Sequence, residues 1–106
     1  MGLLSITEQM YLVAILCLRE DAFGVKIREK VIELTGKTMV FGTLYNNLDQ
    51  LVRKGYVVTD RKGTDSKTGG NARVYYSVSD QGKEALNESK HLQESLWKAM
   101  PRNALI

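Results

Sequence analysis

The spacing of apolar residues changes abruptly at Gly55, and this change is the strongest limit on how the chain can fold. Before Gly55, the residues Leu44, Leu48 and Leu51 recur at positions i, i+4 and i+7, which places them on one face of a helix. After it, β-branched and aromatic residues gather in two short runs, at residues 56–59 and 74–78, as is typical of strands. The sequence therefore predicts helices that give way to a β-hairpin at this glycine.

Three helices are predicted before the hairpin and one after it. Ser5 and Glu8 have the spacing of a capping box, which marks the start of the first helix, and Ser79 is a suitable cap for the last. The predicted helices span residues 5–18, 24–34, 41–54 and 80–100. The second is expected to bury three side chains on one face, those of Ile27, Val31 and Leu34.

This order of elements is that of a winged helix-turn-helix, in which the third helix enters the major groove of DNA and the hairpin, or wing, reaches an adjacent groove or the phosphates. The predicted fold class is mainly α with a small β-hairpin. Two regions are expected: a winged helix-turn-helix DNA-binding domain over residues 1–79 and a C-terminal dimerisation helix over residues 80–106.

The last helix carries an apolar stripe that no later segment can cover. A second copy of the chain, related by a two-fold axis, is the expected cover. The first helix is apolar almost all round, which implies deep burial or a shared interface. The residues expected at a dimer interface are Leu12, Leu16, Leu86, Leu92, Leu96, Trp97 and Met100.

The charge of the chain fits a nucleic-acid partner without establishing one. The formal net charge is +3 and the isoelectric point is about 9.1. Residues 60–73, between the strands, carry four positive and two negative charges, a local excess of +2. This segment either lies against a phosphate backbone or is a solvated loop whose charges keep it soluble.

The face of the third helix opposite its leucines is polar. It carries Thr43, Asn46, Asn47, Gln50 and Lys54. The amide of asparagine can pair with the major-groove edge of adenine through two hydrogen bonds, so Asn46 and Asn47 are candidates for reading bases. The alternatives are hydrogen bonds to phosphates, which only position the helix, or simple solvation.

The motifs of common enzymes are absent from the sequence. It contains neither a glycine-rich phosphate loop nor a nucleophile elbow. The lone His91 has no metal-ligand partner at a suitable spacing and is expected on a solvated helix surface. We therefore predict a protein that is not an enzyme and holds neither cofactor nor metal.

The longest apolar run and the single cysteine indicate where the protein resides. The run covers residues 10–18, about half of a membrane span, so no membrane partner is expected. Cys17 lies within it, cannot form an intramolecular disulfide, and is expected to be a small buried residue. A reducing, cytoplasmic location is predicted.

Four segments together resemble the PadR-like family of transcriptional regulators: MYLVAILCL, AFGVKIREKV, GTLYNNLDQLVRKGYV and GGNARVYYSVSDQGKEAL. The resemblance spans residues 3–86 and is to members with a single long C-terminal helix. It implies a homodimeric DNA-binding regulator, usually a repressor, whose third helix and wing contact double-stranded DNA. Carried over by position, the DNA-contacting roles fall on Thr43, Tyr45, Asn46 and Asn47 in the helix and on Lys62, Lys67 and Arg73 in the wing, and Lys54 is expected to add a phosphate contact.

The chain also departs from the family pattern. Asn46 stands where the family often has proline, and Val40 stands where it commonly has a serine or threonine cap. Arg73 is the only basic residue just before the second strand, where the family has a denser basic run. These departures bear on DNA affinity and on the preferred site.

Three functions remain open at this point. The first is a cytoplasmic homodimeric repressor on a near-palindromic operator, released by a small ligand or a partner protein. The second is a winged-helix module that binds proteins and has lost DNA recognition, which the thin basic wing and Val40 favour. The third is a small-molecule-binding dimer. Family members that bind flat aromatic compounds suggest a ligand-stacking role for Trp97, whose alternative role is packing in the dimer core.

Overall fold

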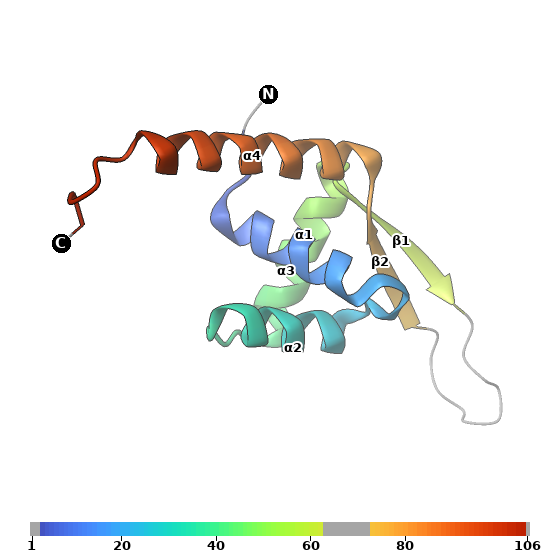
Figure 1. Cartoon of the computed structure of the whole chain (residues 1–106). Coiled ribbons are helices and arrows are strands. Elements are labelled where there is room, and N and C mark those ends of the chain that lie inside the picture. The colour runs from blue at the N-terminus through green and yellow to red at the C-terminus, as the bar shows by residue number, and fades with distance from the viewer. Residues whose placement is uncertain (1–2, 63–72, 106) are drawn as a thin grey trace.

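The computed structural model describes residues 3–62 and 73–105 and shows a small helical body with a β-hairpin on one side and a long last helix (Figure 1). The helices are α1 (Ile6–Leu18), α2 (Gly24–Thr35), α3 (Phe41–Arg53) and α4 (Asp80–Ala99), and a short 3-10 turn (Arg19–Asp21) follows α1. The strands are β1 (Val57–Lys62) and β2 (Arg73–Val78). The predicted fold class, mainly α with a small hairpin, is confirmed.

The first three helices enclose the core. The leucine face of α3 is fully buried at Leu44 and Leu48, as its spacing predicts. On α2 the buried stripe includes Ile27 and Val31 but stops there. The prediction that Leu34 faces inward is wrong, since its side chain is 48% exposed in the last turn of α2, an end that the rest of the subunit leaves uncovered.

The helix α1 begins with the predicted capping box. The hydroxyl of Ser5 accepts a hydrogen bond from the Glu8 amide at 3.0 Å, and the Ser5 amide donates to the Glu8 carboxylate at 2.8 Å. These bonds satisfy two backbone groups that a bare helix end would leave unpaired.

The apolar surface of α1 divides into an inner and an outer face. Leu12 is completely buried in the core of its own subunit, so the prediction that it lines a dimer interface is wrong. Leu16 and Val13 are exposed on the outer face. Cys17 is exposed as well, contrary to the expectation of burial, because it lies on this outer face.

The hairpin is antiparallel, with Val57 opposite Val78 and Lys62 opposite Arg73. Gly55 connects it to α3 with a φ of +82°, a left-handed conformation that glycine adopts at little cost. The Tyr76 amide donates to the Ala22 carbonyl at 2.8 Å, which joins β2 to the segment before α2. The base of the wing is therefore fixed to the helical body.

The helix α4 packs its first part on the body and extends beyond it (Figure 1). A side chain at Gly82 would collide with the carbonyl of Tyr56, so glycine lets α4 start close against the hairpin. Further along, the amide of Gln93 donates to the side-chain oxygen of Gln9 on α1 at 2.7 Å. The division into residues 1–79 and 80–106 stays a prediction.

No helix within the described ranges has the length and apolar character needed to cross a bilayer.

The residue before α3, in the N-cap position, is Val40, whose side chain cannot cap the helix by a hydrogen bond. Val40→Ser is expected to raise the free energy of unfolding by about 1 kcal/mol, because serine accepts a hydrogen bond from a free amide of the first turn. Urea unfolding monitored by circular dichroism measures the change. Val40→Ala is the control and should gain no such stability, and a Val40→Ser protein no more stable than Val40→Ala would contradict the prediction.

Candidate nucleic-acid interface

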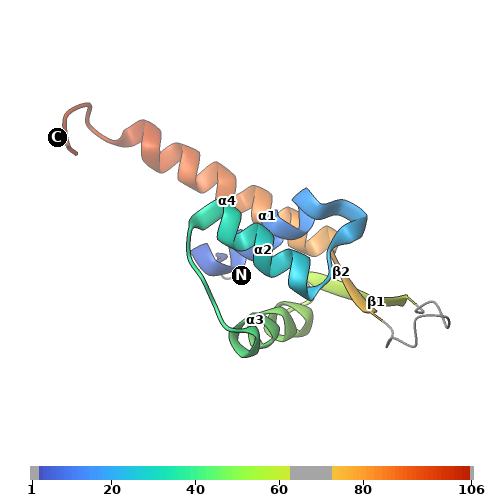
Figure 2. The same ribbon diagram turned by 90° about the horizontal axis from the view of Figure 1, so that it is seen from below.

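The helix α3 lies across the body from α4, and the strands β1 and β2 of the hairpin, or wing, project from the body beside α3 (Figure 2). The buried leucines of α3 point into the body, so its opposite face is left to solvent. Thr43, Asn46 and Gln50 are exposed on this face. Within the described part of the chain, the side chains of Thr43 and Asn46 make no hydrogen bond, so both are available to an external partner.

Asn47 differs from its neighbour Asn46. It is half-buried, and its amide nitrogen donates to the hydroxyl of Tyr11 on α1 at 3.1 Å. The Tyr11 hydroxyl in turn donates to the sulfur of Met39 at 2.7 Å. Asn47 thus joins α3 to α1, and its amide is already engaged in the free protein.

Burial raises the pKa of Tyr11 above its ordinary value of 10.0, while the hydrogen bond from Asn47 acts in the opposite direction. Burial also raises the pKa of Tyr76. The folded protein therefore holds these phenol protons more tightly than the unfolded chain does. The resulting stabilisation is complete below the unfolded pKa and is lost as pH rises through the folded values.

Stability should accordingly fall as pH rises above about 10, and Tyr11→Phe should reduce the steepness of that fall. Urea unfolding of both proteins between about pH 9 and pH 11 measures it. Tyr76→Phe serves as a matched variant with an effect in the same direction. Equal slopes for the wild type and Tyr11→Phe would show that the Tyr11 phenol does not contribute.

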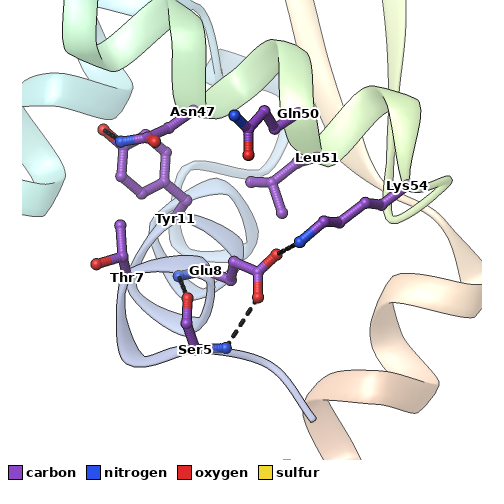
Figure 3. A pocket seen from close by; sticks show the side chains of 8 residues that line it. All are labelled: Ser5, Thr7, Glu8, Tyr11, Asn47, Gln50, Leu51 and Lys54. Carbon is purple, nitrogen blue, oxygen red and sulfur yellow. Dashed lines mark hydrogen bonds and ion pairs between the residues drawn. The ribbon is translucent and has the colours of Figure 1, made fainter. Parts of the chain in front are cut away.

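Lys54 is held by an ion pair. Its ammonium lies 2.6 Å from the carboxylate of Glu8, the residue that also completes the α1 capping box (Figure 3). Burial raises the pKa of Glu8, but Lys54 and the Ser5 amide outweigh it, and the net pKa lies below 4.5. The same hydrogen bond raises the pKa of Lys54. The positive charge expected to face a phosphate is thus neutralised within the free subunit.

An open pocket of about 290 Å³ lies between the start of α1 and α3 around this ion pair (Figure 3). It is lined by Ser5, Thr7, Glu8, Tyr11, Asn47, Gln50, Leu51 and Lys54. Two contacts link the helices across it, Glu8 with Lys54 and Tyr11 with Asn47.

The start of α3 presents an aromatic pair. The rings of Phe41 and Tyr45 stack with their centroids 6.4 Å apart and an interplanar angle of 24°. The guanidinium of Arg28 lies 4.9 Å from the centre of the Phe41 ring. A side chain added at Gly24 would collide with the Tyr45 hydroxyl, so that hydroxyl packs against the bare backbone of α2.

At the outer end of the paired strands, the guanidinium of Arg73 lies 4.4 Å from the centre of the Phe23 ring. Phe23 also meets Tyr75 edge-on, with ring centroids 5.6 Å apart. This packing gives Arg73 a defined position. Lys62 is opposite Arg73 in the strand register, and Lys67 lies outside the described residues.

Sequence reasoning missed three residues of this surface. Arg53 is exposed on α3 seven residues after Asn46, a spacing that puts both on one face and was a usable signal. Arg28 and Phe41 come together only through the packing of α2 against α3, so local sequence gave no sign of their contact.

Apart from the buried Leu12, the residues predicted for a dimer interface lie on the outer face of α1 and along α4. Leu92, Leu96 and Trp97 are exposed, with Trp97 at 63%, whereas Leu86 and Met100 are half-buried. His91 is exposed, as predicted. The described residues include no cluster of histidine, cysteine or acidic side chains suited to a metal ion.

Residues 12–88 match the transcriptional regulator PadR-like family. The chain belongs to this family. The recognition made from its four segments is thereby confirmed, and so is the prediction that the protein is not an enzyme, because the family consists of transcriptional regulators. It is a transcription regulator with the winged-helix fold of DNA-binding proteins. No curated protein sequence matches the chain.

Solved structures of other regulators resemble this PadR-like chain. A PadR-like transcriptional regulator from Bacillus cereus has a TM-score of 0.70 at 22% identity, over 88% of this chain and 85% of that one. A PadR family regulator from Eggerthella lenta has a TM-score of 0.66 at 21% identity, over 87% and 77% of the two chains. A transcriptional regulator from Thermoplasma acidophilum has a TM-score of 0.65 at 22% identity, over 90% and 94%. At these identities the likeness establishes the fold.

Proposed function

We propose that the protein is a cytoplasmic homodimer that represses transcription by binding a near-palindromic operator. Each subunit places α3 in the major groove of one half-site and rests its wing on the adjacent backbone or minor groove. The observation that carries the proposal is the free amide of Asn46 on the exposed face of α3. This helix lies beside the strands of the wing (Figure 2).

The contacts divide by chemistry. Asn46 reads a base, and Thr43 supports it with a hydroxyl from the same exposed face. Arg73, Lys62 and Lys67 supply affinity for phosphates that does not depend on sequence. Lys54 contributes only if it leaves Glu8, and Asn47 only if it leaves Tyr11. Tyr45 supports the start of α3 beside Phe41.

The dimer forms through the apolar residues that one subunit leaves exposed. Leu16 on α1 and Leu92, Leu96 and Trp97 on α4 support this, since a soluble protein rarely leaves a long helix with such a stripe uncovered. Leu86 and Met100 lie at the edge of the same surface. A small aromatic ligand stacked on Trp97, or a partner protein, would release the repressor by shifting one subunit against the other.

Selection from a pool of random duplexes tests the proposal. The enriched sequences should be near-palindromes with half-site centres about 10 base pairs apart, or a multiple of that spacing. Transcription in vitro from a promoter that carries the enriched site should fall as protein is added. Absence of any enriched sequence would refute the proposal.

The second candidate function is a winged-helix module that binds another protein. The ion pair between Lys54 and Glu8 favours it, because it removes one expected phosphate contact. The exposed apolar side chains of Val40 and Phe41 favour it as well. A failure to enrich duplexes and to bind DNA at low salt would favour this function over the first.

A further inference from the structure

The start of α3 exposes two large apolar side chains where a polar one is usual. Val40 is 70% exposed and Phe41 is 45% exposed. Val40 occupies the cap position, where serine, threonine, aspartate or asparagine stabilise a helix. It therefore contributes neither a cap nor much burial. Such a break with local preference is expected at functional sites.

Phe41 is held in place from two sides. Arg28, which lies beside the ring, is itself fixed because its Nε donates to the Met39 carbonyl at 2.7 Å. Tyr45 stacks against the Phe41 ring and is in turn fixed by its packing on Gly24. The Phe41 ring is thus positioned before any partner binds.

We propose that Phe41, with Val40 beside it, contacts the methyl group of a thymine in each half-site. The inference rests on the function proposed above. Residues at the start of a recognition helix meet base edges, and the apolar group on those edges in the major groove is the thymine methyl. The first turn of α3 would then select thymine by apolar contact, and Asn46 in the next turn would select adenine by hydrogen bonding.

A protein partner fits this surface less well. The exposed apolar part consists of Val40, Phe41 and one side of Tyr45, bordered by Arg28 and Thr43. A stable protein interface buries about 800 Å² on each side, far more than these side chains provide. The positive charge of Arg28 beside Phe41 also suits a surface that approaches phosphates.

The test replaces each thymine of the selected operator in turn by deoxyuridine, which removes only the methyl group. At one position in each half-site, the wild type should bind about 4-fold more weakly, and about 16-fold when both half-sites are changed, as expected for one buried methyl per site. Phe41→Ala should bind the thymine and deoxyuridine duplexes equally. Fluorescence anisotropy gives the dissociation constants.

Two further variants guard against a loss of folding. Phe41→Leu keeps an apolar side chain and should retain part of the preference for thymine. Leu34→Ala removes a similarly exposed apolar group from the end of α2 and should keep the wild-type preference.

Three results would overturn the inference: a selected half-site without thymine, wild-type binding that deoxyuridine leaves unchanged at every position, or a Phe41→Ala protein that still prefers thymine. Each of these results counts against the thymine contact alone when the wild type still prefers the selected duplex over a scrambled one. Loss of that preference itself would refute the proposed function, and the thymine contact with it.

Discussion

Leu96→Glu is expected to separate the dimer into monomers and to weaken operator binding by about 10²–10⁴-fold. Leu96 is 59% exposed on α4, within the stripe proposed to pack against the second subunit. A glutamate there places a charge from each subunit in an apolar interface, which is costly unless the charge is paired. Monomers would then bind each half-site separately and lose the gain in affinity that comes from joining two DNA-binding subunits in one dimer.

Sedimentation measures the subunit state, and fluorescence anisotropy measures operator affinity. His91→Glu is the matched control, because it adds the same charge to an exposed residue on another side of α4. The control should remain dimeric and bind normally. A Leu96→Glu protein that stays dimeric would show that the subunits meet elsewhere.

Asn46→Ala should lower the preference for operator over scrambled DNA by about 1–3 kcal/mol per half-site. The reason is the loss of the free amide on the exposed face of α3. The ratio of the two dissociation constants at one salt concentration measures the effect.

Asn47→Ala is the matched control for Asn46→Ala. Its amide bonds to Tyr11, so the change should cost about 0.5–1.5 kcal/mol of folding stability and leave the operator preference nearly intact. The reverse result, in which Asn47→Ala loses the preference and Asn46→Ala keeps it, would show that Asn47 reads the base and Asn46 does not.

Local periodicity was sufficient to predict the helices and the hairpin. The leucines of α3 and the capping box of α1 each lie within a few residues of sequence, and both appear in the structure as predicted. The strands are longer than predicted, with β1 reaching Lys62, because pairing with β2 continues into a polar sequence that strand propensity alone does not mark.

Contacts between distant segments explain the errors and the omissions. On α1, apolar residues occur all round the helix, so spacing alone could not separate the buried Leu12 from the exposed Leu16. The difference between Asn46 and Asn47 arises from Tyr11, which is far away in sequence. The pairing of Lys54 with Glu8 is equally distant and invisible to any local pattern.

The most direct test of the central claim, that α3 and the wing read DNA, is binding of the wild type to the DNA upstream of its own gene, titrated at several salt concentrations. If Lys62, Lys67 and Arg73 each neutralise one phosphate in both subunits, the logarithm of the binding constant should fall with the logarithm of salt with a slope of about −5. Release of Lys54 from Glu8 would steepen it to about −7. We expect a slope in this range and tighter binding to the upstream DNA than to scrambled DNA, and absence of binding even at low salt would show that α3 and the wing do not read DNA.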